Sequence, residues 1–252
     1  MRPILLTALT LLVPSLVSAQ APPPPAPPPP PLWDVQVGAS FVGTSGNSDT
    51  SSAGADFALH RRWPVWQIES AASAVRTSSD DTRTAERYLG LFRGQRRLTS
   101  LVGLAAGIKA ERDRFSGMDF RSISDVGLTW ALIREAGWTL DGITAIALNA
   151  ERPTVGPDRN SPVGLFQLLS RIPFGASGAT TQRVTFYPDF KDTDAHRAEF
   201  EVAAQAAMNS RLALKLGYLV RRSNAPVPGF KKTDGMTTAS VVIQWKASTP
   251  AQ

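Results

Sequence analysis

From Trp33 to Trp245 the sequence alternates between apolar and polar residues with a period of two. The first run alternates between two groups of residues: Trp33, Val35, Val37, Ala39 and Phe41 in one, and Asp34, Gln36, Gly38 and Ser40 in the other. Successive side chains of a β-strand point to opposite faces of the sheet, so this period predicts strands with two unlike faces.

Marking each alternating run predicts an all-β chain of about twelve strands. The ranges are 33–43, 49–61, 65–77, 83–95, 99–112, 119–133, 138–151, 162–171, 180–190, 194–208, 212–223 and 233–246. Most of these runs have about 10 to 15 residues, whereas strands of soluble domains usually have about 5 to 6. A tilted strand needs about 9 to 11 residues to cross a bilayer, so the lengths favour a transmembrane, antiparallel, up-and-down β-barrel.

The connections between the runs alternate between short and long. The short ones are "RRWP", "RRLT", "REAG" and "NSR"; the long, charged ones are "RTSSDDTRT" (76–84), "RDRFSGMDF" (112–120), "ERPTVGPDRNSP" (151–162), "FKDTD" (190–194) and "RSNAPVPGFKKTD" (222–234). Short turns on one side and long loops on the other are typical of bacterial outer-membrane barrels. The polar stretch 43–52, "GTSGNSDTSS", is expected to be the first hairpin tip on the long-loop side.

Tryptophan marks the short-turn side. All six residues of this type, Trp33, Trp63, Trp66, Trp130, Trp138 and Trp245, fall at that end of the expected strands. Indole rings favour the interface between membrane and water, so we expect a periplasmic aromatic girdle there. Phe41, Phe120, Phe186 and Phe200 are expected at the opposite rim.

The N-terminal residues predict export. Residues 1–19 have the form of a cleaved secretory signal peptide, with Arg2 before an apolar run and small residues at the expected cleavage site. Residues 20–32 form a Pro-rich linker, expected to be a stiff polyproline II spacer. We expect the barrel to occupy 33–246 in a Gram-negative outer membrane, with both termini periplasmic and a tail at 247–252. The chain has no cysteine, which excludes disulfides and thiolate metal sites.

Three stretches resemble the family of salt-induced outer-membrane proteins. They are "SFVGTSGNSDTSS" (40–52), "ERDRFSGMDFR" (111–121) and "LALKLGYLVRRSNAPVPGFKKTDGMTTASVV" (212–242), and the resemblance covers nearly all of 33–246. It implies an outer-membrane β-barrel domain of unknown function, without an established substrate. The Pro run and the "KASTPAQ" that follows Trp245 depart from the family pattern. Trp245 would therefore serve the barrel-assembly machinery as an internal aromatic signal.

Strand phase predicts which polar side chains line the lumen. They are Asp34, Gln36, Asp56, Glu69, Lys109, Glu111, Arg121, Asp125, Asp141, Glu151, Arg183, Arg197, Glu199, Glu201 and Lys215. Both charge signs are present, which leaves two interpretations open. The charges pair and nearly fill the interior, or they line a water-filled pore for small polar solutes. The expected function is accordingly envelope integrity and stress response, or passive permeation of small polar solutes.

Other functions have weaker support in the sequence. An outer-membrane hydrolase needs a histidine beside its nucleophile, and neither His60 nor His196 has such a setting. We expect no enzyme activity, no cofactor and no metal site, and scattered Arg residues together with export argue against nucleic acid. Charged long loops are expected to contact lipopolysaccharide and outer-membrane lipid. The alternatives are a barrel enzyme acting on envelope lipid or peptide, and a soluble periplasmic β-barrel that binds a ligand.

Overall fold

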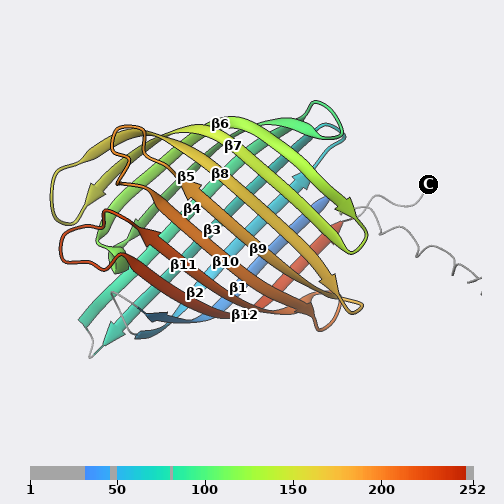
Figure 1. Cartoon of the computed structure of the whole chain (residues 1–252). Coiled ribbons are helices and arrows are strands. Elements are labelled where there is room, and N and C mark those ends of the chain that lie inside the picture. Colours follow the sequence, from blue (N-terminus) through green and yellow to red (C-terminus); the bar gives the residue numbers. More distant parts are fainter. Residues whose placement is uncertain (1–31, 46–49, 80–81, 248–252) are drawn as a thin grey trace, which may run out of the picture.

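Twelve antiparallel strands in the described part of the chain close into one barrel (Figure 1). The computed structural model describes residues 32–45, 50–79 and 82–247. The expected signal peptide, almost all of the Pro-rich linker, the tip residues 46–49 and all but the first residue of the C-terminal tail lie outside these residues. No helix in the described ranges is long and apolar enough to span a membrane.

The strands follow one another around the barrel in chain order. They are β1 (Trp33–Ser45), β2 (Thr50–Arg62), β3 (Trp66–Ser79), β4 (Thr82–Arg97), β5 (Val102–Asp113), β6 (Met118–Glu135), β7 (Trp138–Pro153), β8 (Arg159–Phe174), β9 (Gly178–Tyr187), β10 (Arg197–Ala207), β11 (Leu212–Ser223) and β12 (Thr233–Ala247). A short 3₁₀ turn, η1 (Arg114–Ser116), connects β5 to β6. Closure comes from β1 and β12, which pair from Trp33 opposite Ala247 to Ser45 opposite Gly235. The predicted fold class is confirmed.

Turns of two to four residues connect the strands at one end, which we call the short-turn end. At the other, long-loop end, the connections 154–158, 188–196 and 224–232 have five to nine residues. The two ends lie at the right and left of Figure 1, respectively. The last residue of β12 lies beside the first of β1 at the short-turn end.

Several of the expected boundaries are wrong, and two of them change the connections between strands. The stretch 76–84 is not a long loop, because β3 continues to Ser79 and β4 resumes at Thr82. The strand expected at 180–190 ends at Tyr187, because Pro188 has no N–H to donate to the ladder. The chain then forms a loop in which Asp189 makes a single bridge to Val163.

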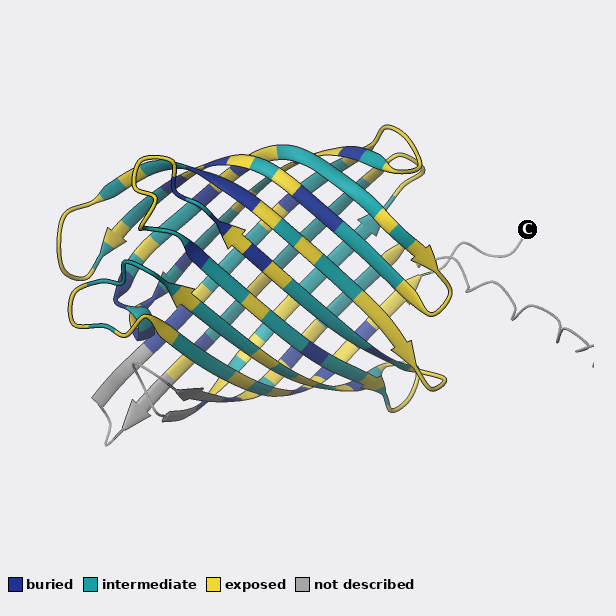
Figure 2. Ribbon diagram, in the orientation of Figure 1, coloured by how far each residue is buried: buried dark blue, intermediate teal, exposed yellow. Residues whose placement is uncertain are grey.

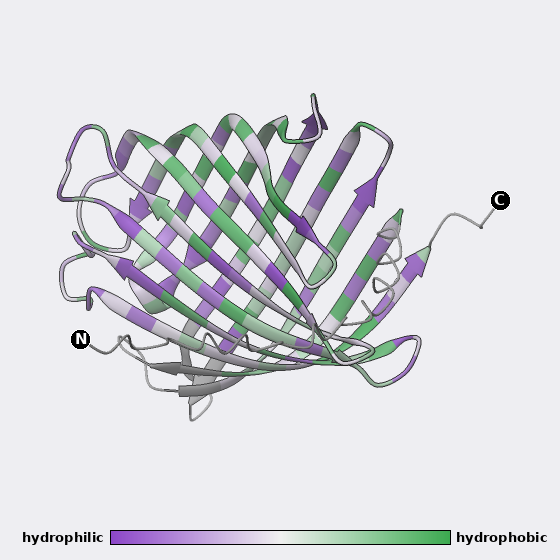
Figure 3. Ribbon diagram, turned by 45° about the vertical axis from the view of Figure 1, so that its right-hand side comes forward, coloured by the Kyte–Doolittle hydropathy of each residue, from purple (hydrophilic) through white to green (hydrophobic). Residues whose placement is uncertain are grey.

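The two faces of the barrel differ in composition (Figures 2 and 3). Large apolar side chains such as Phe57, Ile108, Ile146, Leu168 and Leu216 are exposed on the outer face. Buried residues alternate with them along the strands, and hydropathy alternates in the same way. An apolar face that is exposed all round a closed barrel is the arrangement that a bilayer would cover, since closure leaves no unpaired strand edge.

Candidate functional site

Contacts between strands that are not neighbours show which side chains point into the barrel. Lys109 on β5 lies 3.0 Å from Glu199 on β10. Asp113, also on β5, pairs with Arg221 on β11. Four strands separate β5 from β10 on the shorter path around the barrel, and five separate it from β11. Both pairs therefore cross the lumen, which we take as the candidate functional site.

The residues predicted to line the lumen fall into three groups along the barrel axis. Near the long-loop end lie Lys109, Glu111, Arg121, Glu151, Arg197 and Glu199. Near the middle lie Asp56, Asp125, Arg183 and Glu201, and toward the short-turn end lie Asp34, Gln36, Glu69, Asp141 and Lys215. The structure brings the first group together, and in the third group the side-chain amide of Gln36 donates a hydrogen bond to Asp34 at 3.1 Å.

An ion-pair network occupies the lumen near the long-loop end. Arg121 lies 3.0 Å from Glu111 and 2.8 Å from Glu151. Arg87 lies 3.6 Å from Glu111 and 3.3 Å from Asp113. These side chains are largely buried, and Asp113 is fully so. Paired charges of both signs crosslink this part of the interior.

A second buried ion pair lies directly over a glycine on the inner face of the barrel. Arg93 on β4 and Asp125 on β6 are 2.7 Å apart, although β5 lies between their strands. Gly107 on β5 leaves the space for the pair, because an added Cβ would lie 2.8 Å from Arg93 Nε and 3.0 Å from Asp125 Oδ2. The pair therefore depends on a residue without a side chain.

An apolar cluster fills one side of the lumen near the long-loop end. Phe115 of η1 packs against Val42 on β1 and Val75 on β3, with Met236 of β12 against the cluster. Gly117 ends η1 with φ of 73°, a conformation that favours glycine, and an added Cβ there would clash with the ring of Phe230. We call Val42, Val75, Phe115 and Met236 the apolar plug.

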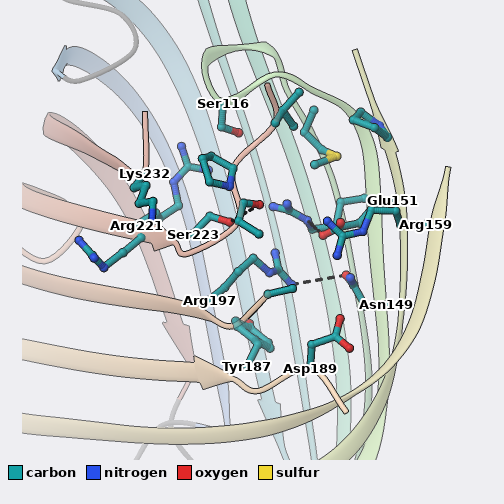
Figure 4. A pocket seen from close by; sticks show the side chains of 18 of the residues that line it. Ser116, Asn149, Glu151, Arg159, Tyr187, Asp189, Arg197, Arg221, Ser223 and Lys232 are labelled. Atoms are coloured by element: carbon teal, nitrogen blue, oxygen red, sulfur yellow. Dashed lines mark hydrogen bonds and ion pairs between the residues drawn. The ribbon is translucent and has the colours of Figure 1, made fainter. Parts of the chain in front are cut away.

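On the opposite side of the cross-lumen pairs lies a cavity of about 320 Å³, which we call the cup. Side chains from β6, β7, β9, β10 and β11 line it, among them Arg121 on β6. Figure 4 shows Glu151, Tyr187, Arg197 and Arg221 around it. The loops 154–158 and 224–232 add Val155, Pro157, Pro226, Val227 and Pro228. The cup thus combines charged walls with an apolar margin.

Two hydrogen bonds hold loop 224–232 against the loop before β10. Asn224 donates its backbone N–H to the carbonyl of His196 (3.1 Å) and its side-chain amide to the carbonyl of Asp194 (2.9 Å). The two loops therefore form a connected margin over the cup.

Asp189 lies in the loop between β9 and β10, at the edge of the cup. Burial by itself raises the pKa of this carboxyl. Hydrogen bonds from the hydroxyl of Ser161 (2.6 Å) and the backbone N–H groups of Lys191 (2.8 Å) and Asp192 (3.2 Å) outweigh that effect. Together they hold the pKa of Asp189 below its usual value.

Below the cup the lumen is more open to water. Arg183 on β9 and Glu201 on β10 are 3.1 Å apart, and their side chains are 37% and 38% exposed although they face inward. Nearer the short-turn end Gln205 and Gln244 are hydrogen-bonded at 3.4 Å. Asp141 pairs with Arg134 at the short-turn mouth rather than deep inside.

The predicted aromatic girdle lies at the short-turn end. Trp33, Trp63, Trp66, Trp138 and Trp245 are exposed there, and Trp130 is partly covered. The guanidinium of Arg61 lies over the rings of Trp33 and Trp63, at 3.7 and 4.5 Å from their centroids. Phe41, Phe120, Phe186 and Phe200 are exposed on the outer face nearer the long-loop end.

Among the inward charges that sequence reasoning missed are Arg87, Arg93, Arg221 and Asp113. Arg87 and Arg93 share the inner face of β4 with Leu89 and Leu91, so the alternation in that strand is ambiguous. Arg221 is the first residue of an Arg pair next to a long loop. The long loop expected at 112–120 includes Asp113, which is wrong, because Asp113 ends β5 and is buried against Arg87 and Arg221. Strand parity continued to the end of β5 would have found Asp113.

In the part of the chain that the structure describes, the histidines and carboxylates do not form a recognisable catalytic group. The ring of His196 lies 5.9 Å from that of Phe186, and its Nδ1 is 3.2 Å from the carbonyl of Thr193. His60 lies on β2 opposite Glu69 of β3. Within residues 32–45, 50–79 and 82–247, no group of three or more His, Asp or Glu side chains could hold a metal ion.

A closed antiparallel barrel with an apolar outer face and a charged lumen has the architecture of outer-membrane channels. Solved structures agree in fold. The chain is 11% identical to a structure described as the NanC porin, with 82% of this chain and 98% of the other covered at a TM-score of 0.57. It is 12% identical to the COG4313 outer membrane channel from Pseudomonas putida F1, with coverages of 90% and 100% and a TM-score of 0.52.

Residues 37–245 match the family described as "Protein of unknown function, DUF481", and the chain belongs to this family. The resemblance to a barrel domain of unknown function is thereby confirmed. No curated protein matches the sequence significantly.

Proposed function

We propose that the protein is an integral outer-membrane barrel that gives small polar solutes a narrow, passive route through its lumen. The observation that carries this proposal is a charged interior with accessible side-chain surface inside a closed barrel. The half-exposed pair Arg183 and Glu201 lies one layer below the cup. Accessible side-chain surface there, under a cavity of about 320 Å³, supports a path along the β9 and β10 wall.

The route is narrow because ion pairs and the apolar plug occupy much of the upper lumen. Lys109 and Glu199 cross the lumen beside the cup, and Phe115 fills the side away from it. Long side chains such as Lys and Arg can change rotamer on fast timescales, so a small solute could pass when they move. We therefore propose low conductance rather than a wide general pore.

The proposed orientation places the long-loop end at the cell surface and the short-turn end in the periplasm. Exposed Arg152 and Asp158 lie 3.5 Å apart at the long-loop end. Such cations can pair with lipopolysaccharide phosphates, and the carboxylates can share bridging divalent ions. Trp245, exposed near the end of β12, would be the aromatic signal for the barrel-assembly machinery.

The test is recording from the purified full chain in planar lipid bilayers. We expect small, reproducible conductance steps from protein that migrates faster in gels before heating than after it. Folded, heat-modifiable protein that gives no steps would refute the permeation function. Recovery of the protein in the aqueous fraction without detergent would refute membrane residence as well.

A second candidate function is mechanical support of the envelope without transport. The observation that favours it is the crosslinked lumen, with Lys109 joined to Glu199 and Asp113 to Arg221 across the barrel. It predicts a folded, non-conducting barrel whose loss makes cells sensitive to detergent or osmotic stress. Bilayer recording separates this candidate from the first.

We assign no enzymatic role to the barrel. His196 contacts Phe186 and a backbone carbonyl, which is a structural setting rather than that of a general base. Hydrolysis of phospholipid or peptide by the purified protein, lost in a His196→Ala variant, would contradict this assignment.

A further inference from the structure

Arg197 is a buried cation without an acidic partner. It is only 7% exposed, yet no carboxylate in the described residues lies within 4.0 Å of its guanidinium. Its contacts are one hydrogen bond to Asn149 Oδ1 at 3.4 Å and the ring of Tyr187, 4.9 Å from the guanidinium carbon. A guanidinium has five N–H donors, so most of its capacity is unused. None of its nitrogens is among the fully buried side-chain atoms without a partner, so the remaining N–H groups open onto the cup.

The nearby carboxylates are already engaged elsewhere. Glu151 accepts a hydrogen bond from Arg121 at 2.8 Å, and both oxygens of Glu199 lie 3.0 Å from Lys109. Asp189 accepts from Ser161 and from two backbone N–H groups. The cup therefore holds a guanidinium whose neighbouring acids neutralise other groups.

The cup as a whole carries a positive excess. Among the described residues it is lined by seven basic side chains, Arg121, Arg159, Arg197, Arg221, Arg222, Lys231 and Lys232, and by four acidic ones, Glu151, Asp189, Glu199 and Asp234. A cleft lined mainly by one sign of charge raises the local concentration of solutes of the opposite sign. The excess favours an anion at the bottom of the cup, where Arg197 lies beside Tyr187 and Asn149 (Figure 4).

The size of the cup limits the ligand. About 320 Å³ lies at the lower end of the range of small-molecule sites, roughly 300 to 1,000 Å³. A planar guanidinium matches a carboxylate with two parallel hydrogen bonds. The ring of Tyr187 and the side chain of Val163 offer a less polar surface for the rest of the molecule.

We infer that the cup binds a small organic acid, the size of a monosaccharide acid, through an ion pair between its carboxylate and Arg197. This inference rests on the proposed function only where it places the binding site on a transport route. The binding itself does not require a conducting pore, so the two can be tested separately.

The direct test is calorimetric titration of the folded full chain in detergent with glucuronate, and with glucose as the neutral analogue. Glucuronate is expected to bind and glucose is not. Arg197→Met should weaken the affinity for glucuronate about tenfold or more, because it removes a charged hydrogen-bond donor from a buried site. Equal binding of glucose, or unchanged affinity in Arg197→Met, would overturn the inference.

The control is Arg152→Met. Arg152 is 71% exposed at the same end of the barrel and does not line the cup, so this variant makes the same change of net charge outside the site. Its affinity for glucuronate should match that of the unaltered protein. A similar loss in both variants would mean that general electrostatics, and not Arg197, holds the anion.

A second measurement guards against a folding defect. Because Arg197 is buried and unpaired, Arg197→Met should unfold in urea at the same or a higher concentration than the unaltered protein. A marked loss of stability would assign Arg197 to the structure of the barrel and overturn the inference.

Bilayer recording separates this inference from the proposed function. Channels without glucuronate binding would overturn the binding site and leave permeation standing. Binding without channels would overturn permeation and leave the site standing. If both hold, a potassium chloride gradient should show anion preference, and Arg197→Met should reduce it.

Discussion

Single residues decide which charges can meet inside this barrel. Arg93 and Asp125 belong to strands that flank β5, and they meet because Gly107 has no side chain between them. The other partners in the network reach each other because long Arg and Lys side chains extend away from the wall. Ion pairs in the lumen therefore need both long charged side chains and small residues that leave space for them.

Gly107→Val should destabilise the barrel. The new methyl groups would occupy the space of the Arg93 and Asp125 head groups, and overpacking of this kind typically costs about 1 to 3 kcal/mol. The measurement is the free energy of unfolding in urea for protein folded in lipid vesicles. Gly90→Val is the matched control, because a Cβ at Gly90 meets nothing within 4 Å, and it should be nearly neutral. Equal effects of the two substitutions would show that Gly107 is not needed for the pair.

The pKa of Asp189 gives a pH-dependent contribution to the loop between β9 and β10. Its folded-state pKa is lowered, so the contribution is complete above the unfolded-state pKa, about 3.9, and is lost as pH falls through the folded-state pKa. Carbon-detected NMR of the carboxyl group should report a pKa below that of an unfolded Asp. Ser161→Ala should raise that pKa toward the usual value, and no rise would contradict the role of the hydroxyl.

Strand phase was readable from the sequence wherever one face carried nearly all the large apolar residues. In β10, Phe200 and Val202 oppose Glu199 and Glu201, and the lumen-facing residues were assigned without ambiguity. In β4, Tyr88 and Phe92 lie outside while Leu89 and Leu91 lie inside, so the period no longer distinguishes the faces. The inward Arg87 and Arg93 were missed for that reason.

Partners across the lumen could not be read from the sequence. Which inward residues meet depends on the tilt and register of strands far apart in the chain. The pairing of Lys109 with Glu199 joins residues 90 positions apart, and that of Asp113 with Arg221 joins residues 108 apart. The cup also depends on strand register, because its lining residues on β7, β9 and β11 must lie at the same level along the barrel axis.

The element η1 closes one side of the upper lumen. Phe115→Ala should leave the barrel closed, since the strand ladders do not involve this side chain, but it should remove the centre of the apolar plug. Loss of a buried Phe typically costs about 3 to 5 kcal/mol. We expect a larger single-channel conductance in planar bilayers, because water can enter the space that the ring leaves.

Phe120→Ala is the control for this change. Phe120 lies on the outer face of β6 near the same end and is exposed, so its loss should not alter the conductance. An unchanged conductance in Phe115→Ala would mean that ions use only the side of the lumen that contains the cup.

The molecule as a whole is a barrel divided lengthwise near its long-loop end. Asp113 with Arg221 and Lys109 with Glu199 form a partition from β5 to β10 and β11. The cup lies on one side of it, and the apolar plug lies on the other. Solute access and ion flow are therefore expected to depend on different side chains.

Removing one cross-lumen pair should widen the passage without unfolding the barrel. The double variant Lys109→Met with Glu199→Gln deletes both charges together, so no unpaired charge remains buried, and replacement of this kind is often neutral for stability. We expect higher conductance and glucuronate binding that is no weaker, because the variant removes an acidic side chain that lines the cup, whereas Lys109 does not line it. The matched control is Arg183→Met with Glu201→Gln, a pair of the same chemistry that joins neighbouring strands and does not cross the lumen. An equal rise in conductance in both double variants would show that loss of lumen charge, and not loss of the partition, opens the path.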